Sequence, residues 1–471
     1  MKVEQIYTGC LAHAAYYIES KGEAAVIDPL REVQPYINRA KLDDAKIKYI
    51  FETHFHADFV SGHLDLQKKT NATIVFGPTA KPGYDAYIAK DEEIFEVGDY
   101  KIKVIHTPGH TLESTTYLLI DENGNEHGII TGDTLFIGDV GRPDLAQKVT
   151  EDLTQEKLAG HLYDSLRNKI MPLGDNLIVY PNHGAGSACG KNMSSETTDT
   201  LGHQKQVNYA LNPELSKEDF IEAVLEGLKE PPGYFPANVM MNINGYQSYD
   251  DIIQKGKRNL SPDEFESVAN ETGAVVLDVR HQRDYAKGHI PRSIFIGLDG
   301  DFAPWVGTLV IDVKQPILLV APNGRIEEAI TRLSRVGFDN IKGYLNGGFE
   351  AWKNASKEYD TVTTIYAMDL KKVIEKEKPV IYDVRKESEY ETEHVIDTQH
   401  QCLTTLPNHI DDFPKNKIFY IHCAGGYRSM IAASILKSRG IHNFIDVDGG
   451  FESIKEVGVP TSKQKCSTTI H

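Results

Sequence analysis

Short apolar runs alternate with polar loops over about the first 190 residues of the chain, and this pattern predicts β-strands. A helical spacing also occurs near Glu151–Asn168, where Leu158, Leu162 and Leu166 would share one face. Strands and helices in this mixture predict a sheet-rich α/β domain. The clearest predicted strands are Ile47–Glu52, Thr73–Phe76, Tyr100–His106, Thr116–Ile120 and Leu177–Tyr180.

The stretch from about Asn192 to Asn259 is mixed in character. It contains one amphipathic helical pattern, Lys217–Lys229, followed by a Pro-Pro-Gly sequence that would end the helix. We interpret it as an extension of the first domain that leads into a linker. A new domain is then expected at Ser261, because a serine, a proline and a glutamate follow one another in the order of a capped helix start.

The second half of the chain repeats itself. Val275–Arg280 (VVLDVR) returns as Val380–Arg385 (VIYDVR), and Asn346–Phe349 (NGGF) returns as Asp448–Phe451 (DGGF). In each copy an apolar strand precedes a turn and a helix, the order typical of a parallel sheet covered by helices. Two copies of one α/β unit are therefore expected.

The overall composition agrees with about three domains in 471 residues, of which 40% are hydrophobic. A formal net charge of −18 argues against binding to nucleic-acid phosphates. We expect no membrane partner, because no apolar run approaches the length of a bilayer span and the N-terminus lacks the pattern of a signal peptide. The five cysteines are far apart, which favours a reducing, cytoplasmic location.

Histidines and aspartates follow the predicted strands of the first half. The main motif, Thr53–Phe59, reads THFHADF, and three further groups contain His110, Asp133 and His183. Side chains on separate loops that each follow a strand can converge at one edge of a sheet sandwich and hold a metal. The sequence therefore predicts a metal site in the first domain.

The order of these motifs resembles the metallo-β-lactamase superfamily, which implies an αββα sandwich. Its dinuclear hydrolases carry HxHxDH, whereas here the last position is Phe59, which cannot bind a metal. The remaining residues resemble the persulfide dioxygenase branch. That resemblance implies one Fe(II) per chain, held by His54, His110 and Asp133. His56, Asp58 and His183 would then orient the ligands and bound water.

Two histidines and a carboxylate leave coordination positions open for a substrate and O₂, which suits Fe(II). Two nearby residues are candidates for substrate binding. Arg142 lies in GDVGRPD, which resembles a segment of the same branch; it either shapes the site and meets an anionic thiol, or pairs with Asp139 or Asp144. Cys189 follows His183 closely and either handles sulfur or is a buried, inert thiol.

In the last copy a buried-strand pattern is followed by CAGGYRS, residues 423–429, and then by a helical run. A cysteine at this junction lies beneath backbone N–H groups that favour a thiolate. The two glycines, Gly425 and Gly426, allow the tight loop, and Arg428 and Ser429 complete it. This loop resembles that of rhodanese sulfurtransferases, which implies that Cys423 carries a persulfide and that Arg428 fixes the loop or binds an anion.

The first copy contains no cysteine, and Pro322 or Asn323 is expected at the position of Cys423. We interpret this copy as a degenerate rhodanese-like domain that acts as a spacer or docking domain, or as a binding site for a thiol substrate. The expected domains are residues 1–245, 258–358 and 364–465. Together they predict an α/β protein with an N-terminal metallo-β-lactamase sandwich followed by two rhodanese domains with parallel sheets.

The expected function is oxidation of low-molecular-weight persulfides by O₂ to sulfite, with Cys423 then transferring sulfane sulfur to sulfite to give thiosulfate. The expected partners are therefore small persulfides, O₂ and sulfite, and fusions of this type suggest a homo-oligomer. A metal-dependent thioester hydrolase of the glyoxalase II kind and a non-enzymatic sulfur carrier are the alternatives. The carrying thiol, glutathione, coenzyme A or another, is left open.

Overall fold

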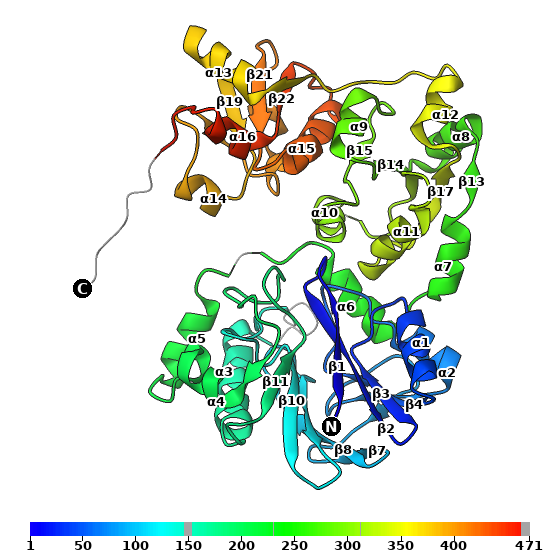
Figure 1. Cartoon of the computed structure of the whole chain (residues 1–471), viewed down its shortest axis with the longest axis vertical. Coiled ribbons are helices and arrows are strands. Elements are labelled where there is room, and N and C mark those ends of the chain that lie inside the picture. Colours follow the sequence, from blue (N-terminus) through cyan, green and yellow to red (C-terminus); the bar gives the residue numbers. More distant parts are fainter. Residues whose placement is uncertain (146–152, 229, 311, 463–471) are drawn as a thin grey trace. The chain divides into compact units, whose positions relative to one another are not determined.

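The computed structural model describes residues 1–145, 153–228, 230–310 and 312–462 (Figure 1). By its internal contacts the chain divides into two compact units. The first holds Met1–Asp251 together with Leu333–Asp339, and the second begins at Ile252 and holds the rest of the described chain.

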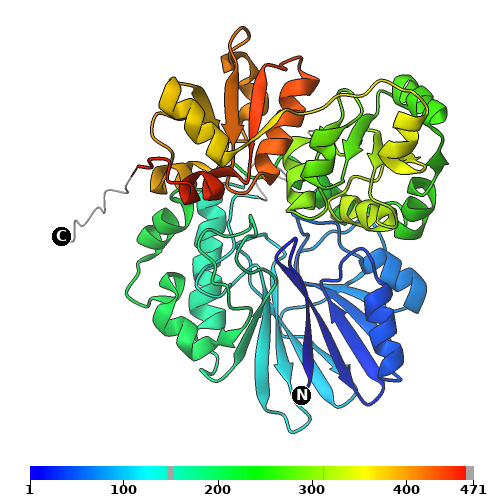
Figure 2. The same ribbon diagram turned by 45° about the horizontal axis from the view of Figure 1, so that its top comes forward.

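Two six-stranded sheets form the centre of the first unit and face each other (Figure 2). The strand order is β1-β2-β3-β4-β5-β6 in one sheet and β12-β11-β10-β9-β8-β7 in the other. The strands of the first sheet are β1 (Val3–Thr8), β2 (His13–Ser20), β3 (Glu23–Ile27), β4 (Lys46–Glu52), β5 (Thr73–Phe76) and β6 (Tyr87–Ile88). Those of the second are β7 (Ile94–Val97), β8 (Tyr100–His106), β9 (Thr115–Ile120), β10 (Glu126–Gly132), β11 (Ile178–Pro181) and β12 (Asp199–Thr200).

Each sheet buries both of its faces. A core between the sheets contains Tyr16 from β2, Phe51 from β4 and Tyr117 from β9, all of them fully buried. The outer faces pack against helices, through Tyr36 and Leu66 on one side and through residues such as Leu162 on the other. The expected αββα sandwich is confirmed.

The helices of this unit follow the sequence pattern only in part. The helix expected at Glu151–Asn168 is present from Gln155, with Thr154 as its N-cap, and Glu151 and Asp152 lie outside the described residues. Its C-terminal part, Leu166–Ile170, is a π-helix. The α-helices are α1 (Gln34–Leu42), α2 (His63–Thr70), α3 (Gln155–Ser165), α4 (Leu201–Val207), α5 (Lys217–Leu225) and α6 (Phe235–Asn244). The next helix, α7 (Tyr249–Gly256), contains the division between the two units.

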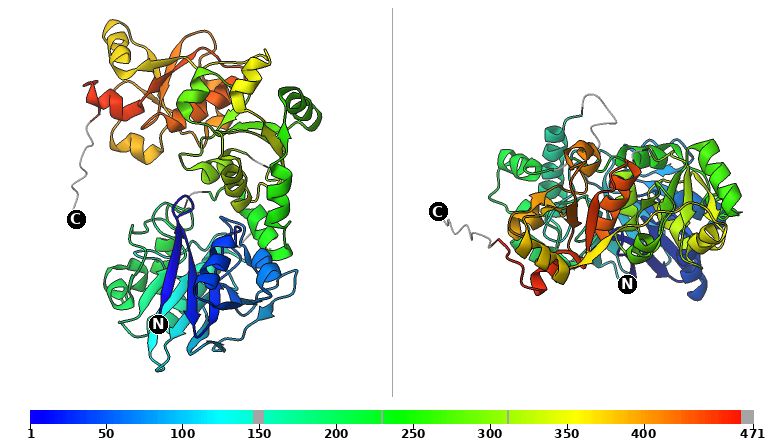
Figure 3. Two further views of the ribbon diagram at one scale, coloured as in Figure 1. Left: turned by 45° about the vertical axis from the view of Figure 1, so that its right-hand side comes forward. Right: turned by 90° about the horizontal axis from the view of Figure 1, so that it is seen from above.

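The second unit contains two five-stranded parallel sheets, each flanked by helices (Figure 3). The strand orders are β13-β17-β16-β14-β15 and β18-β22-β21-β19-β20, so the two copies have the same topology. The strands are β13 (Asn259–Leu260), β14 (Val275–Asp278), β15 (Ile294–Phe295), β16 (Ile317–Val320), β17 (Ile341–Leu345), β18 (Thr364–Tyr366), β19 (Val380–Asp383), β20 (Gln399–His400), β21 (Phe419–His422) and β22 (Phe444–Asp448).

The helices of the second unit connect these strands. The expected helix start at Ser261 is confirmed, with a capping box between Ser261 and Glu264. The α-helices are α8 (Pro262–Thr272), α9 (Gln282–Lys287), α10 (Phe302–Leu309), α11 (Ile326–Arg335), α12 (Gly348–Asn354), α13 (Ala367–Lys376), α14 (Glu387–Thr392), α15 (Tyr427–Ser438) and α16 (Gly450–Glu456).

The strand register identifies the residue equivalent to Cys423 in the first copy. Asp278 pairs with Val320 in that copy and Asp383 pairs with His422 in the other, so Val320 corresponds to His422. The next residue is Ala321, and the expectation of Pro322 or Asn323 was wrong by one or two positions. The error arose because the two loops differ in sequence, so that only the pairing of the strands aligns the two copies. Alanine also cannot carry sulfur.

Helices long and apolar enough to cross a bilayer do not occur in the described part of the chain.

Candidate metal centre and cysteine loop

Loops at the ends of three strands bring the predicted metal ligands together. His54 follows β4, His110 lies in the loop after β8, and Asp133 follows β10. All three are buried, and one donor atom from each lies within 4.8 Å of the others. The Nε2 atoms of His54 and His110 are 3.8 Å and 3.5 Å from Oδ2 of Asp133. The donor atoms of the three predicted ligands therefore lie close together.

The donor atoms fit a bound metal ion. Nε2 of His54 and both carboxylate oxygens of Asp133 are buried and have no hydrogen-bond partner among the described residues. Buried polar atoms are normally satisfied, and a cation between them would supply the missing partner. Two imidazoles and one carboxylate suit Fe(II) with open positions, and the same set also suits catalytic zinc.

Contacts of the other ring nitrogens fix both imidazoles. Nδ1 of His54 lies 2.9 Å from the hydroxyl oxygen of Thr53, and Nδ1 of His110 lies 2.7 Å from the carbonyl oxygen of Arg142. Burial and the neighbouring imidazoles hold the pKa of His54 well below 6.5, so its ring is neutral. Imidazoles fixed in this way, with Nε2 directed inward, are prepared for metal binding.

A second group of donors lies beside the first. It consists of His56, Asp58 and His183, all buried, with donor atoms again within 4.8 Å of one another. Nε2 of His183 is 3.5 Å from the carboxylate of Asp58, and Nε2 of His56 is 3.0 Å from Oδ1 of Asp28. The ring of Phe59 packs against that of His56, with centroids 4.3 Å apart.

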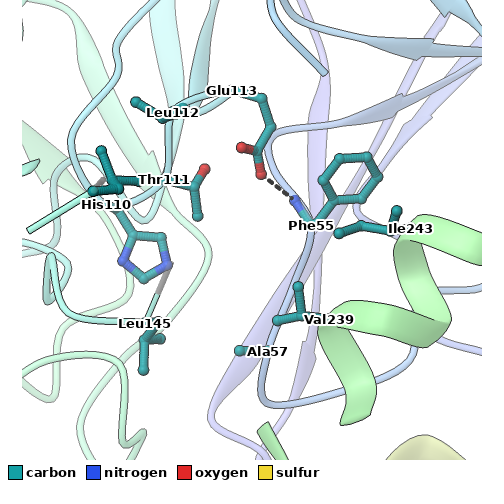
Figure 4. Close-up of a pocket in the computed structure, with 10 residues that line it drawn as sticks. Phe55, Ala57, His110, Thr111, Leu112, Glu113, Leu145, Val239 and Ile243 are labelled. Carbon is teal, nitrogen blue, oxygen red and sulfur yellow. Dashed lines mark hydrogen bonds between the residues drawn. The ribbon is translucent and has the colours of Figure 1, made fainter. Parts of the chain in front are cut away.

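An apolar pocket reaches His110. Figure 4 shows His110 and Leu112 on one side of it, and Phe55, Val239 and Ile243 on the other. Glu113 accepts a hydrogen bond from the backbone N–H of Phe55, which ties the two sides together. The lining is almost entirely carbon, so the pocket suits an aliphatic chain leading to the metal site.

Cys423 lies at the carboxyl end of β21, where the loop turns into α15. Its side chain is buried, and the N–H of Gly426 points at Sγ from 3.1 Å. Gly426 has a φ of +96°, in the left-handed region that glycine adopts without strain. Gly450 lies against the back of the loop, where a Cβ would approach the Cys423 carbonyl oxygen to 2.5 Å. The loop therefore holds a backbone donor on a buried sulfur.

The remaining loop residues also occupy defined positions. The guanidinium of Arg428 forms two hydrogen bonds with the carboxylate of Glu389 on α14, of 2.6 Å and 2.9 Å. Of the two expected roles for Arg428, this contact favours fixing the loop. The hydroxyl of Ser429 donates to the carbonyl oxygen of Gly426, and Gly425 lines the cavity in front of Cys423.

Comparison with known proteins places both parts of the chain. The model of the metallo-beta-lactamase superfamily matches residues 8–183. The solved structure of a metallo-beta-lactamase from Staphylococcus aureus is 32% identical, with a TM-score of 0.64, over 73% of this chain and 98% of that one. The chain belongs to the metallo-beta-lactamase superfamily. The model of the rhodanese-like domain matches residues 261–355 and 367–457, so two rhodanese-like domains follow the metallo-beta-lactamase fold.

Among curated proteins, a probable hydroxyacylglutathione hydrolase of Schizosaccharomyces pombe is 27% identical over 45% of this chain and 88% of its own length. A hydroxyacylglutathione hydrolase of Haemophilus influenzae is 26% identical over 41% of this chain and 90% of its own length. The solved structure of ETHE1 from Myxococcus xanthus is 26% identical over 52% of this chain and 99% of that one, with a TM-score of 0.44.

In this metallo-beta-lactamase fold, Arg142 and Cys189 lie next to the predicted metal ligands. The guanidinium of Arg142 pairs with the carboxylate of Asp144 through two hydrogen bonds of 2.6 Å, one of the two expected arrangements, while its carbonyl oxygen holds His110. Cys189 is buried within 4.8 Å of donor atoms of Asp133 and His183. Burial, together with the nearby carboxylates of Asp58 and Asp133, raises the pKa of Cys189 well above 9, so its thiol is protonated.

Two residues near the site were not predicted from the sequence. Asp28 accepts hydrogen bonds from the backbone N–H of Thr53 and from the side chain of Asn182, besides contacting His56. Tyr234 is buried, and burial and the proximity of Asp58 and Cys189 raise its pKa well above 10. Asp28 directly follows strand β3, as other site residues follow strands, and this position could have identified it from the sequence. No sequence pattern connects Tyr234 with the site.

Proposed function

We propose that this protein oxidises low-molecular-weight persulfides with O₂ at a single Fe(II) held by His54, His110 and Asp133, and that Cys423 transfers sulfane sulfur to the sulfite produced. The observation that carries the proposal is the pairing, in one chain, of a His-His-Asp donor set with a rhodanese-type cysteine loop. Iron at such a set would supply the redox chemistry with O₂ that zinc does not.

The side chains around the donor set have separate tasks in this proposal. The apolar pocket beside His110 would bind the carbon chain of the persulfide and bring its terminal sulfur toward the three ligands. Phe59, whose ring packs against His56, would deny the second donor group a histidine ligand at position 59. Cys189 would remain a neutral thiol beside Asp133, since its raised pKa disfavours the thiolate.

Sulfur transfer at Cys423 requires no oxidant. The thiolate of Cys423 would attack the terminal sulfur of R–S–SH, forming a Cys423–S–SH persulfide and releasing R–S⁻ with the electron pair of the broken S–S bond. Sulfite would then take the terminal sulfur as thiosulfate, and the Cys423 thiolate would be regenerated. The N–H of Gly426 lies where it would stabilise negative charge on Sγ.

The test is oxygen uptake by anaerobically purified, Fe(II)-loaded protein after addition of glutathione persulfide or coenzyme A persulfide. We expect uptake that is lost in His110→Ala. In Cys423→Ser we expect sulfite to form and thiosulfate to be absent. Iron-loaded protein that consumes no O₂ with either persulfide would contradict the oxidation, and loss of sulfite in Cys423→Ser would contradict the division of labour.

A second candidate function is hydrolysis of a glutathione thioester at a metal site. It is favoured by the second donor group, His56, Asp58 and His183, and by the similarity of the chain to hydroxyacylglutathione hydrolases. Zinc-loaded protein should then hydrolyse a hydroxyacyl glutathione thioester, whereas the primary proposal predicts no such turnover.

A further inference from the structure

The cavity in front of Cys423 is larger than sulfite or thiosulfate requires. Its volume is about 550 Å³, within the range of sites that bind small organic molecules. Cys423, Lys386 and Arg428 line it from the last copy, while Asp299, Asp301 and Trp305 line it from the first copy. The cysteine-less copy thus forms one wall of the cavity, an arrangement closer to the expected thiol-binding site than to a spacer.

The two copies are joined at this cavity by a specific contact. The hydroxyl of Tyr427, inside the CAGGYR loop, donates a 2.7 Å hydrogen bond to the carbonyl oxygen of Gly297. Its ring lies so close to Gly300 that a Cβ there would approach the ring to 2.4 Å. Tyr427 therefore fixes the loop that carries Cys423 against the part of the first copy that lines the cavity.

The charged groups of the cavity are only partly neutralised. Arg428 pairs with Glu389, and Asp299 pairs with Arg325 at 2.6 Å. Asp301 precedes α10, but its side chain makes no capping hydrogen bond there. Within the described residues, Asp301 and Lys386 form no ion pair, which leaves one carboxylate and one ammonium in the same cavity.

We propose that this cavity binds an α-amino-acid persulfide as the sulfur donor, with Asp301 binding its ammonium group and Lys386 its carboxylate. The inference rests on the proposed role of Cys423 and adds the class of donor. A zwitterion matches one spare charge of each sign, and the indole of Trp305 offers an apolar surface to the carbon chain. A donor with several phosphates would instead meet the uncompensated carboxylate of Asp301.

The experiment compares cysteine persulfide with N-acetylcysteine persulfide, which lacks the ammonium group. The full-length protein is assayed without O₂, with sulfite as acceptor and thiosulfate as the product measured. We expect kcat/KM to favour cysteine persulfide about tenfold, the size of one charge-assisted hydrogen bond. Asp301→Asn should reduce this preference to within about twofold, and Asp301→Glu should retain part of it.

The matched control is Glu350→Gln, which neutralises an exposed carboxylate on α12 outside the cavity lining and should keep the wild-type preference. Equal kcat/KM values for the two donors in the wild type would overturn the inference, as would an unchanged preference in Asp301→Asn. Absence of transfer from both donors would overturn the proposed role of Cys423 as well, so the two failures are distinguishable.

Discussion

Nδ1 of His110 lies 2.7 Å from the carbonyl oxygen of Arg142. A carbonyl oxygen only accepts, so Nδ1 carries a hydrogen, and Nε2 is the ring nitrogen that faces Asp133. The backbone after Asp133 thus sets the orientation of a residue on a different loop. Since Gly141-Arg142 belongs to this backbone, its conformation controls the metal site.

Gly141→Ala should weaken metal binding. A Cβ at this position would come within 2.0 Å of the Asp133 carbonyl oxygen and 3.0 Å of His110 Nδ1, so the backbone must move and take the ligand with it. We expect the affinity for iron or zinc to fall about 10- to 100-fold, as for other changes that disturb ligand orientation. Metal content after dialysis measures it. The control is Gly9→Ala, where a Cβ meets nothing within 4 Å, and equal metal loss in both variants would refute the prediction.

Phe59→His should create a second metal site. The new imidazole would replace a ring that packs against His56, completing the HxHxDH order of the dinuclear hydrolases. We expect zinc bound per chain to rise from one to two, determined by elemental analysis after removal of excess metal. The matched control is Phe59→Leu, which removes the ring and adds no ligand. An unchanged stoichiometry in Phe59→His would mean that Phe59 is not what prevents binding of a second metal.

Arg385→Ala should strongly destabilise the last domain. Arg385 pairs with the fully buried Asp383 at 2.6 Å, and its guanidinium lies 4.0 Å from the ring centre of Phe451. Its removal would leave a buried carboxylate without its cation, at a cost of about 3–5 kcal/mol in the free energy of unfolding. Lys372→Ala breaks an exposed pair with Asp369 and should cost less than about 1 kcal/mol. Urea unfolding compares the two, and similar losses would disprove the distinction.

Asp446→Asn should change how stability depends on pH. Burial, and then the charge of Asp448, raise the pKa of Asp446 to about 7, from 3.8. A carboxyl whose pKa is higher in the folded state favours folding only while protonated, so the wild type should lose stability as the pH rises from about 4 to about 7, by at most about 4 kcal/mol.

The asparagine variant does not ionise, so its urea midpoint should exceed that of the wild type at pH 8 by more than at pH 5. Glu375→Gln, at an exposed position on α13, serves as the control and should follow the wild type at both pH values. A difference between Asp446→Asn and wild type that is the same at pH 5 and pH 8 would rule out ionisation of Asp446 as the cause.

The fold was predictable to the extent that local patterns specify it. The strands at Thr73–Phe76 and Tyr100–His106 are present as predicted, because short runs of apolar residues with high strand propensity specify a buried strand locally. The helix at Lys217 ends at Leu225, earlier than expected, since hydrophobic spacing does not mark helix ends well; the expected last residue, Lys229, lies outside the described residues. The equivalence of Ala321 and Cys423 required the strand register, a long-range property.

By itself, the sequence determined the chemistry available to this protein: the kinds of metal ligand, the loss of one ligand at Phe59, the repeated α/β unit and its single loop cysteine. These follow from residue type and spacing, which are local. The tertiary structure alone decided which nitrogen of His110 faces Asp133, that Arg142 pairs with Asp144, and that Asp301 lies in the cavity of Cys423. Such relationships join residues distant in the chain, and packing of the folded elements fixes them.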